Sequence, residues 1–232
     1  MSRRKKLEKF ADLFQYPHVY ESFEFNDELL TRTETERLLM RGKWRPLQFQ
    51  NNHPLIVELA CGRGEYSLDL ARRYPAKNFI GIDIKGARIW KGATIALEEE
   101  LSNVAFVRAR IEQIELFFNT GEIDEIWITF PDPFMRDTQE NRRLTAPIFL
   151  AKYEKLLNKG GKIHLKTDSD SLYEYSLDAV NTYPKTQLLT QSDNIYHREL
   201  PHPDLDILTY YEKQHLADNR TIKYLCFSYL EM

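Results

Sequence analysis

Cysteine and long apolar segments are scarce in this sequence. Two cysteines, Cys61 and Cys226, stand far apart among 232 residues, with no other Cys or His at metal-ligand spacing, which argues against a disulfide framework and against a bound metal. No apolar run approaches the roughly 20 residues that cross a bilayer, and no signal-peptide pattern opens the chain. We therefore expect a cytoplasmic protein with no membrane contact.

An excess of positive charge is also absent. Lys and Arg number 32 against 35 for Asp and Glu, a formal charge of −3. Nucleic-acid-binding proteins are often basic overall, so this balance weighs mildly against such a partner, although a local basic patch is sufficient for binding. The hydrophobic fraction of 42% is ordinary for a globular protein, and the length suits one domain with a substantial core.

Strands and helices alternate along most of the chain. Short apolar segments predict strands at residues 55–59, 78–83, 104–107, 126–130 and 162–167. Apolar residues at helical spacing predict helices at residues 66–74, 89–97, 147–157 and 171–182, and Gly160-Gly161 is expected to end the third. This alternation predicts an α/β fold with a mostly parallel sheet. Beyond Pro184, residues 186–189 and 221–230 are expected to form two more strands, which brings the total to seven. We expect these two strands to pair as an antiparallel hairpin with no helix between them.

The first fifty residues have a different character, because their apolar spacings sustain no single period. We predict an N-terminal arm over residues 1–50 and one folded domain over residues 51–232. Basic and aromatic side chains alternate in the arm, which suits the phosphates and bases of a nucleic acid: Arg3, Arg4, Lys5, Lys6, Lys9, Phe10, Phe14, Tyr16 and Tyr20. A solvated tail without a partner is the alternative.

A glycine turn follows the first strand of the predicted domain. Gly62 and Gly64 allow the backbone to approach a ligand closely. The third glycine of a dinucleotide-binding turn is replaced by Ser67, which disfavours an NAD-type oxidoreductase. Glu58 would repel a pyrophosphate but suits the sulfonium and ammonium groups of S-adenosylmethionine, and Asp83, at the end of the next strand, can accept hydrogen bonds from ribose hydroxyls. Alternatively, the glycines only form a tight turn and Asp83 caps a helix.

A Pro-Asp-Pro segment, residues 130–134, follows the fourth strand at the same edge of the sheet. The two prolines restrict the backbone around Asp132, so its carboxylate is held where it can accept hydrogen bonds from a base edge. The related Asp/Asn-Pro-Pro-aromatic motif of amino-methyltransferases has a second adjacent proline that is missing here. The alternative is a loop in which Asp132 only satisfies its own turn. Arg136, Arg142 and Arg143 follow, at positions suited to phosphate contacts.

Together these segments resemble the bacterial tRNA (guanine-N7)-methyltransferase family over roughly residues 50–230. The resemblance rests on residues 58–64, 81–83, 101–103, 130–134, 142–144, 160–161, 167–168 and 209–212. It implies a Rossmann-like class I fold that binds S-adenosylmethionine and methylates N7 of guanosine 46 in the variable loop of tRNA.

The resemblance also assigns roles to individual residues. Asp132 is implied at the meeting point of cofactor and guanine, as catalytic residue and cofactor contact. The remaining cofactor contacts implied are Glu58, Gly62, Gly64 and Asp83, and the implied substrate contacts are Arg136, Asp168, Thr209 and Glu212.

Several positions depart from the family pattern. Ala60 replaces the first glycine of the turn, Asp83 replaces a longer glutamate, and Phe134 replaces a tryptophan. Arg110 stands where an acidic residue is expected after the third strand, which puts the adenine contact in doubt. The basic run at residues 139–143 keeps only two arginines, so tRNA affinity is expected to be lower or differently distributed.

The reaction expected from this pattern needs no general base, because guanine N7 carries a lone pair and no proton. Catalysis would then consist mainly of alignment, with the Asp132 carboxylate orienting the base. Two alternatives stay open: a class I methyltransferase acting on another substrate, and a tRNA-binding relative that has lost catalysis.

Overall fold

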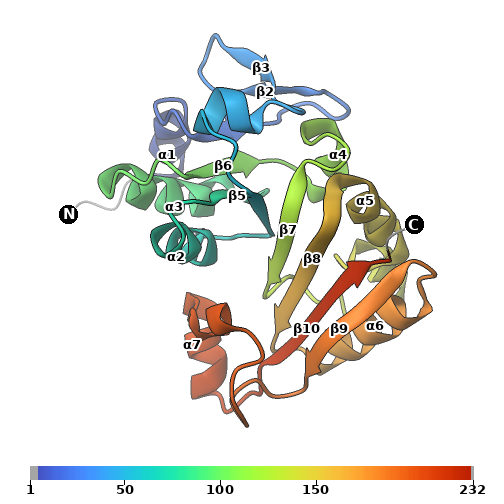
Figure 1. The fold of residues 1–232 in the computed structure, drawn as a ribbon. Coiled ribbons are helices and arrows are strands. Elements are labelled where there is room, and N and C mark those ends of the chain that lie inside the picture. The colour runs from blue at the N-terminus through green and yellow to red at the C-terminus, as the bar shows by residue number, and fades with distance from the viewer. Residues whose placement is uncertain (1–4, 231–232) are drawn as a thin grey trace.

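One ten-stranded sheet organises the computed structural model, which describes residues 5–230. The predicted domain contributes seven strands: β4 (Leu55–Leu59), β5 (Asn78–Asp83), β6 (Val104–Arg108), β7 (Ile123–Thr129), β8 (Leu157–Thr167), β9 (Thr186–Ser192) and β10 (Lys223–Tyr229). They lie in the order β6-β5-β4-β7-β8-β10-β9, and the first five run parallel while β10 is antiparallel to both neighbours (Figure 1). The predicted fold class is confirmed.

Helices cover both faces of this sheet, as expected for strands with apolar residues on both faces. Every residue of β4 is buried, and its side chains alternate between two hydrophobic clusters, with Val57 in one and Ile56 in the other. A strand buried on both faces reads as a continuous apolar run. The covering helices are α2 (Glu65–Arg73), α3 (Gly86–Glu98), α4 (Ile114–Phe117), α5 (Pro147–Leu156) and α6 (Asp170–Thr182).

Two predictions about the later part of the chain are wrong. Helix α5 ends at Leu156, and the chain enters β8 directly, so Gly160 and Gly161 lie within a strand. The segment between β9 and β10 contains a 3-10 turn (Pro203–Asp206) and helix α7 (Tyr210–Ala217), where no helix was expected. Helix α7 has one buried residue, the charged Glu212, so it lacks the apolar stripe by which a helix is recognised.

The first fifty residues join the same sheet. Helix α1 (Lys6–Leu13) lies beside α3, and β1 (Val19–Glu21) pairs in parallel with β6. Strands β2 (Leu29–Thr31) and β3 (Arg37–Leu39) extend the edge, and a π-helix (Trp44–Phe49) leads back to β4. The sheet therefore continues across the boundary expected at residue 50. Within residues 5–230, no helix is both long and apolar enough to cross a membrane.

Candidate active site

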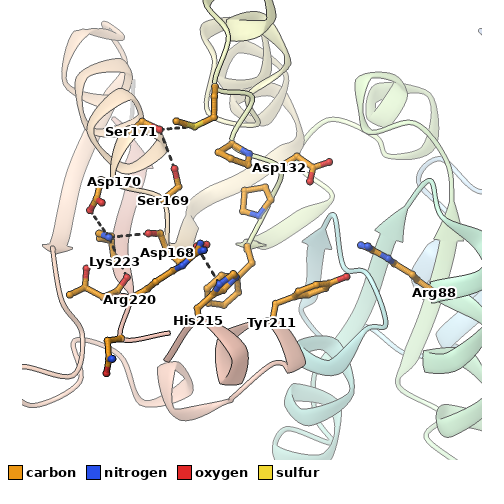
Figure 2. Close-up of a pocket in the computed structure, with 16 residues that line it drawn as sticks. Arg88, Asp132, Asp168, Ser169, Asp170, Ser171, Tyr211, His215, Arg220 and Lys223 are labelled. Atoms are coloured by element: carbon orange, nitrogen blue, oxygen red, sulfur yellow. Dashed lines mark hydrogen bonds and ion pairs between the residues drawn. The ribbon is translucent and has the colours of Figure 1, made fainter. Parts of the chain in front are cut away.

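Two neighbouring cavities open at the carboxyl ends of the parallel strands. The smaller, about 280 Å³, is lined by residues that include Ala60, Asp83, Ile84, Arg110, Ile111, Leu144 and Phe149. The larger, about 880 Å³, is lined by residues that include Asp168, Asp170, Tyr211, His215, Arg220 and Lys223 (Figure 2). Arg88, Phe130, Pro131 and Asp132 line both. In parallel sheets this edge is where ligands bind.

The glycine turn after β4 is tightly constrained. Ala60, Gly62 and Gly64 all have positive φ, at +57°, +57° and +68°. A Cβ at Gly64 would lie 2.3 Å from the ring of Phe106, whereas a Cβ at Gly62 would meet no atom within 4 Å. Gly64 therefore allows the turn to pack against β6, and Gly62 leaves open space beside the turn. The alanine at position 60 adopts a conformation that glycine accommodates at lower energy.

Asp83 connects this turn to the end of β5. Its Oδ2 accepts a hydrogen bond from the Gly62 N–H (2.9 Å), and its Oδ1 accepts one from the Lys85 N–H (2.7 Å), just before α3. The carboxylate is buried and also lines the smaller cavity. Each of its oxygens retains a lone pair, because a carboxylate accepts about four hydrogen bonds. Asp83 thus holds the turn while still facing the cavity.

Glu58 lies beneath the turn and lines neither cavity. Its Oε2 accepts hydrogen bonds from the Ser67 N–H (2.9 Å) and hydroxyl, and its Oε1 accepts one from the Thr129 hydroxyl (2.7 Å). Burial raises the pKa of Glu58 to about 7, and these three bonds only partly oppose that shift. The structure therefore places Glu58 as an internal connection between β4, α2 and β7.

The Pro-Asp-Pro segment leaves β7 through a strained backbone. Phe130 and Phe134, which bracket it, have φ of +48° and +44°, a region that is costly for aromatic residues. Asp132 is exposed between them at the junction of the two cavities, and no side chain or backbone group of residues 5–230 hydrogen-bonds to its carboxylate. Figure 2 shows it above the larger cavity, opposite Tyr211.

The arginines that follow this segment have three different placements. Arg143 is buried and donates hydrogen bonds to the carbonyls of Pro133 (3.2 Å) and Phe134 (3.0 Å). Arg142 lies 4.5 Å from the Phe134 ring centroid and lines the smaller cavity. Arg136 is exposed and lines neither cavity. Arg143 thus holds the loop from inside, while Arg142 and Arg136 are available to a partner.

Charged groups alternate around the larger cavity. The Asp168 carboxylate accepts a hydrogen bond from Arg220 (2.8 Å) and lies 3.4 Å from His215 Nδ1. Lys223 donates to the Asp168 carbonyl (3.0 Å) and pairs with Asp170, as the dashed lines in Figure 2 show. Asp168 is therefore at the cavity, as the sequence implied, but its carboxylate is already paired with Arg220.

Thr209 and Glu212 do not reach either cavity. The Thr209 hydroxyl caps α7 by accepting a hydrogen bond from the Glu212 N–H (3.2 Å). Both side chains are buried, and Glu212 has no exposed surface. The residues of α7 that do line the larger cavity are Tyr211 and His215.

Sequence patterns missed several residues of the larger cavity, among them Arg88, Tyr211, His215, Arg220 and Lys223. Tyr211 lies within the Thr-x-x-Glu element, which was the available signal, while the others belong to no motif. Arg110, at the position where an acid is expected, lines the smaller cavity close to Glu112.

The basic N-terminal segment lies near this edge of the sheet. Arg3 and Arg4 fall outside the described residues. On α1, Lys9 Nζ lies 4.6 Å from the Trp90 ring centroid of α3, and Phe10 stacks at 4.6 Å against the guanidinium of Arg108, at the end of β6. The contact with α3 brings Lys9 of α1 next to the helix that carries Arg88.

Similarity to known proteins agrees with this geometry. Residues 52–225 match a family model described as putative methyltransferase. Solved structures with a similar fold include the 16S rRNA methyltransferase KamB (TM-score 0.60, 11% identity, 85% of this chain and 97% of that one). Another is a 16S rRNA (adenine(1408)-N(1))-methyltransferase from Catenulisporales acidiphilia, solved with S-adenosylmethionine (TM-score 0.57, 12% identity, 84% and 94%). At these identities the likeness concerns the fold alone.

Curated relatives match over nearly the whole chain. A tRNA (guanine-N(7)-)-methyltransferase of Bacteroides thetaiotaomicron is 45% identical, over 97% of this chain and 85% of the relative. Enzymes of the same name from Porphyromonas gingivalis (45%; 95% and 86%) and Christiangramia forsetii (42%; 98% and 99%) match similarly. The chain therefore belongs to the tRNA (guanine-N(7)-)-methyltransferase family.

Proposed function

We propose that this protein methylates N7 of guanine 46 in the variable loop of tRNA, with S-adenosylmethionine as the methyl donor. The observation that carries the proposal is the position of Asp132. Its carboxylate, without a partner among residues 5–230, lies where the two cavities meet. One cavity has the chemistry for a nucleoside cofactor, and the other has room for a nucleobase.

The smaller cavity fits the cofactor. Asp83 offers unfilled acceptor capacity to ribose hydroxyls, and the apolar side chains of Ile84, Ile111 and Phe149 offer surfaces to the faces of an adenine. The open space beside Gly62 leaves room for the rest of the molecule. S-adenosylmethionine, when bound, supplies the electrophilic methyl group. Gly64 and Glu58 would contribute by holding the shape of the turn.

The larger cavity supports recognition of guanine by Asp132. A carboxylate there can accept hydrogen bonds from guanine N1–H and the exocyclic amine, and adenine has no N1–H to offer. N7 reacts through its lone pair, so no protein group has to remove a proton. The positive charge that develops on the ring is stabilised by the nearby Asp132 carboxylate. The two flanking prolines hold this carboxylate in place, so it does not have to reorganise during the reaction.

Contacts to the rest of the tRNA are proposed for exposed groups around both cavities. Arg136 and Arg142 would meet phosphates near the target base, and Asp168 would bind within the larger cavity. Lys9 of α1, beside α3, extends this surface toward the N-terminus. A cytoplasmic location accords with a tRNA substrate and stays a prediction.

The proposal is tested by incubating the protein with methyl-labelled S-adenosylmethionine and an unmodified tRNA transcript, followed by borohydride reduction and aniline cleavage. We expect label in the tRNA and a single cut in the variable loop. A transcript with adenine at position 46 is the matched control and should stay unlabelled. Label without the cut would replace N7 of guanine by another target, and cofactor binding without label would point to another substrate. If neither label nor cofactor binding is observed, the result would favour a tRNA-binding relative that has lost catalysis.

A further inference from the structure

A buried ion pair lies behind the larger cavity. The Nζ of Lys166, on β8, is 2.7 Å from Oε2 of Glu212, on α7, and neither side chain has any exposed surface. The sequence resemblance placed Glu212 among the substrate contacts and assigned nothing to Lys166. In the structure both side chains point into the protein, and neither lines a cavity.

Each group of the pair is also held by hydrogen bonds to other parts of the protein. The Lys166 ammonium donates hydrogen bonds to the carbonyls of Leu205 (2.9 Å) and Ile207 (3.0 Å), and its contact with Glu212 Oε2 is an ion pair without hydrogen-bond geometry. Glu212 Oε1 accepts a hydrogen bond from the Tyr196 hydroxyl (2.7 Å). Burial lowers the pKa of Lys166, and the carboxylate of Glu212 opposes that shift.

The pair connects two walls of the larger cavity. The Lys166 carbonyl accepts a hydrogen bond from the Phe130 N–H (2.8 Å), and its ammonium lies 6.0 Å from the Phe130 ring centroid. Phe130 opens the segment that carries Asp132. On the other side, Glu212 belongs to α7, whose Tyr211 and His215 face the cavity, and His215 also packs against Phe130, with ring centroids 5.7 Å apart.

Stability alone does not account for this arrangement. An apolar pair of similar volume is often as stable as a buried ion pair or more so, because desolvation of two charges offsets their attraction. Buried charges that are also held by hydrogen bonds, Lys166 by two carbonyls and Glu212 by the Tyr196 hydroxyl, instead specify one position for the helix. This matters at α7, which lacks an apolar stripe to fix its register against the sheet.

We infer that Lys166 and Glu212 are positioning residues that hold the α7 wall of the cavity at the correct distance from Asp132. Neither touches the guanine. The inference rests on the proposed function, because it concerns the site that would bind the base. It predicts that the two residues act as one unit, so that losing either has nearly the same consequence as losing both.

The test is steady-state kinetics of tRNA methylation for Lys166→Met, Glu212→Gln and the double variant. A wall displaced by about 1 Å is expected to lower kcat/KM for tRNA about 100-fold, mainly through KM. The affinity for S-adenosylhomocysteine, measured by calorimetry, should stay within about twofold, because the α7 residues Tyr211 and His215 line only the larger cavity. The double variant should be no worse than the worse single variant.

Controls separate this role from simple loss of folding. Lys185→Met breaks a half-exposed ion pair with Glu154 (2.7 Å) before β9, at the opposite edge of the sheet, and should leave the kinetics unchanged. Misfolding would reduce the calorimetric stoichiometry and kcat together and leave KM unchanged. If the single variants fail to fold, Tyr196→Phe removes one hydrogen bond from Glu212 and should still raise KM, by about threefold to tenfold.

Results that contradict the inference can be told apart from a result that contradicts the proposed function. If Glu212 contacts guanine directly, Glu212→Gln loses most activity, Lys166→Met loses little, and the two effects multiply in the double variant. That pattern, or an unchanged KM in Lys166→Met and Tyr196→Phe, overturns the inference. Failure of the wild-type protein to methylate tRNA in the same assay instead contradicts the proposed function.

Discussion

Strand β4, which leads into the glycine turn, and helix α7 each carry a buried glutamate that the sequence assigned to a ligand. Glu58, beneath the turn, is surrounded by neutral donors from Ser67 and Thr129. Glu212, in α7, faces the ammonium of Lys166 and the hydroxyl of Tyr196. Both connect elements of the fold, but only the second has a countercharge.

The presence or absence of a countercharge gives the two buried glutamates different roles. Without a cation, burial raises the pKa of Glu58 to about 7, so the group is a modest structural connection whose charge depends on pH. With Lys166 at 2.7 Å, Glu212 forms an ion pair that holds a helix against the sheet. Neither glutamate lines a cavity, whereas Asp83 and Asp132 do. Asp83 and Asp132, both proposed to bind ligands, thus combine unfilled acceptor capacity with a place at a cavity.

The largest expected effect comes from Asp132, the exposed acid that both regions border. Removing its carboxylate in Asp132→Ala should lower kcat/KM for tRNA about 1000-fold, the loss typical of one preorganised electrostatic group. Asp132→Asn should be nearly as damaging, because its amide would present N–H groups to the donors of guanine. Steady-state tRNA methylation measures both.

The matched control for Asp132 is Asp178→Ala, which removes an exposed carboxylate from α6, away from both cavities. It should leave kcat/KM unchanged. Near-normal turnover in Asp132→Ala, with the fold intact, would remove this residue from the mechanism and would weaken the distinction drawn between cavity-facing and internal acids.

Glu58→Gln sharpens the comparison through its pH dependence. Because the folded-state pKa of about 7 exceeds the unfolded value of 4.5, folding favours the protonated acid. Below pH 4.5 the acid is neutral in both states. As pH rises to 7 the unfolded chain releases its proton first, so the wild-type protein loses stability relative to Glu58→Gln, by about 3 kcal/mol above pH 7.

Denaturant unfolding of both proteins from pH 4 to pH 8 measures this difference. Glu154→Gln is a suitable control, since the surface pairing with Lys185 lowers the pKa of Glu154. Its relative stability should change in the opposite direction, and by less. A difference between wild type and Glu58→Gln that stays constant across this pH range would contradict an uncompensated buried carboxylate.

The central sheet was predictable because its signals are local. Strands β4 to β8 are apolar runs, and α2 and α6 show apolar residues at helical spacing. Asp83 and Asp132 were predictable as site residues because strand ends in a parallel sheet meet at one edge. Strands β1, β2 and β3 have three residues each, which is too few to show the alternating apolar pattern of a strand.

The direction of a side chain at such an edge was not predictable. Whether Glu58 faces the cavity depends on the Thr129 hydroxyl, 71 residues away. The position of α7 depends on Lys166, on a strand 46 residues earlier, and not on its own apolar pattern. Arg88 and Lys223 reach the cavities through the packing of α3 and β10, which no local motif encodes.

The two glycines of the turn should differ when each is replaced by alanine. Gly62→Ala adds only the cost of a positive φ, about 1 kcal/mol, since its Cβ would meet no atom within 4 Å. Gly64→Ala also drives a Cβ to 2.3 Å from the buried Phe106 ring, so we expect a loss of about 3 kcal/mol. Equal losses in denaturant unfolding would contradict the packing role assigned to Gly64.

The smallest expected effect is a gain at Ala60, where the turn begins. Its φ of +57° strains an alanine, and glycine relieves that strain while adding entropy to the unfolded chain, so Ala60→Gly should stabilise the protein by about 0.5–1 kcal/mol. Ala96→Gly, in the interior of α3, is the control of opposite sign, with an expected loss of about 1 kcal/mol. Because Ala60 lines the smaller cavity and glycine removes only a methyl group, S-adenosylhomocysteine affinity should not fall. A loss of stability in Ala60→Gly would mean that the methyl group contributes packing worth more than the strain, and the turn would then owe its shape to contacts as much as to its glycines.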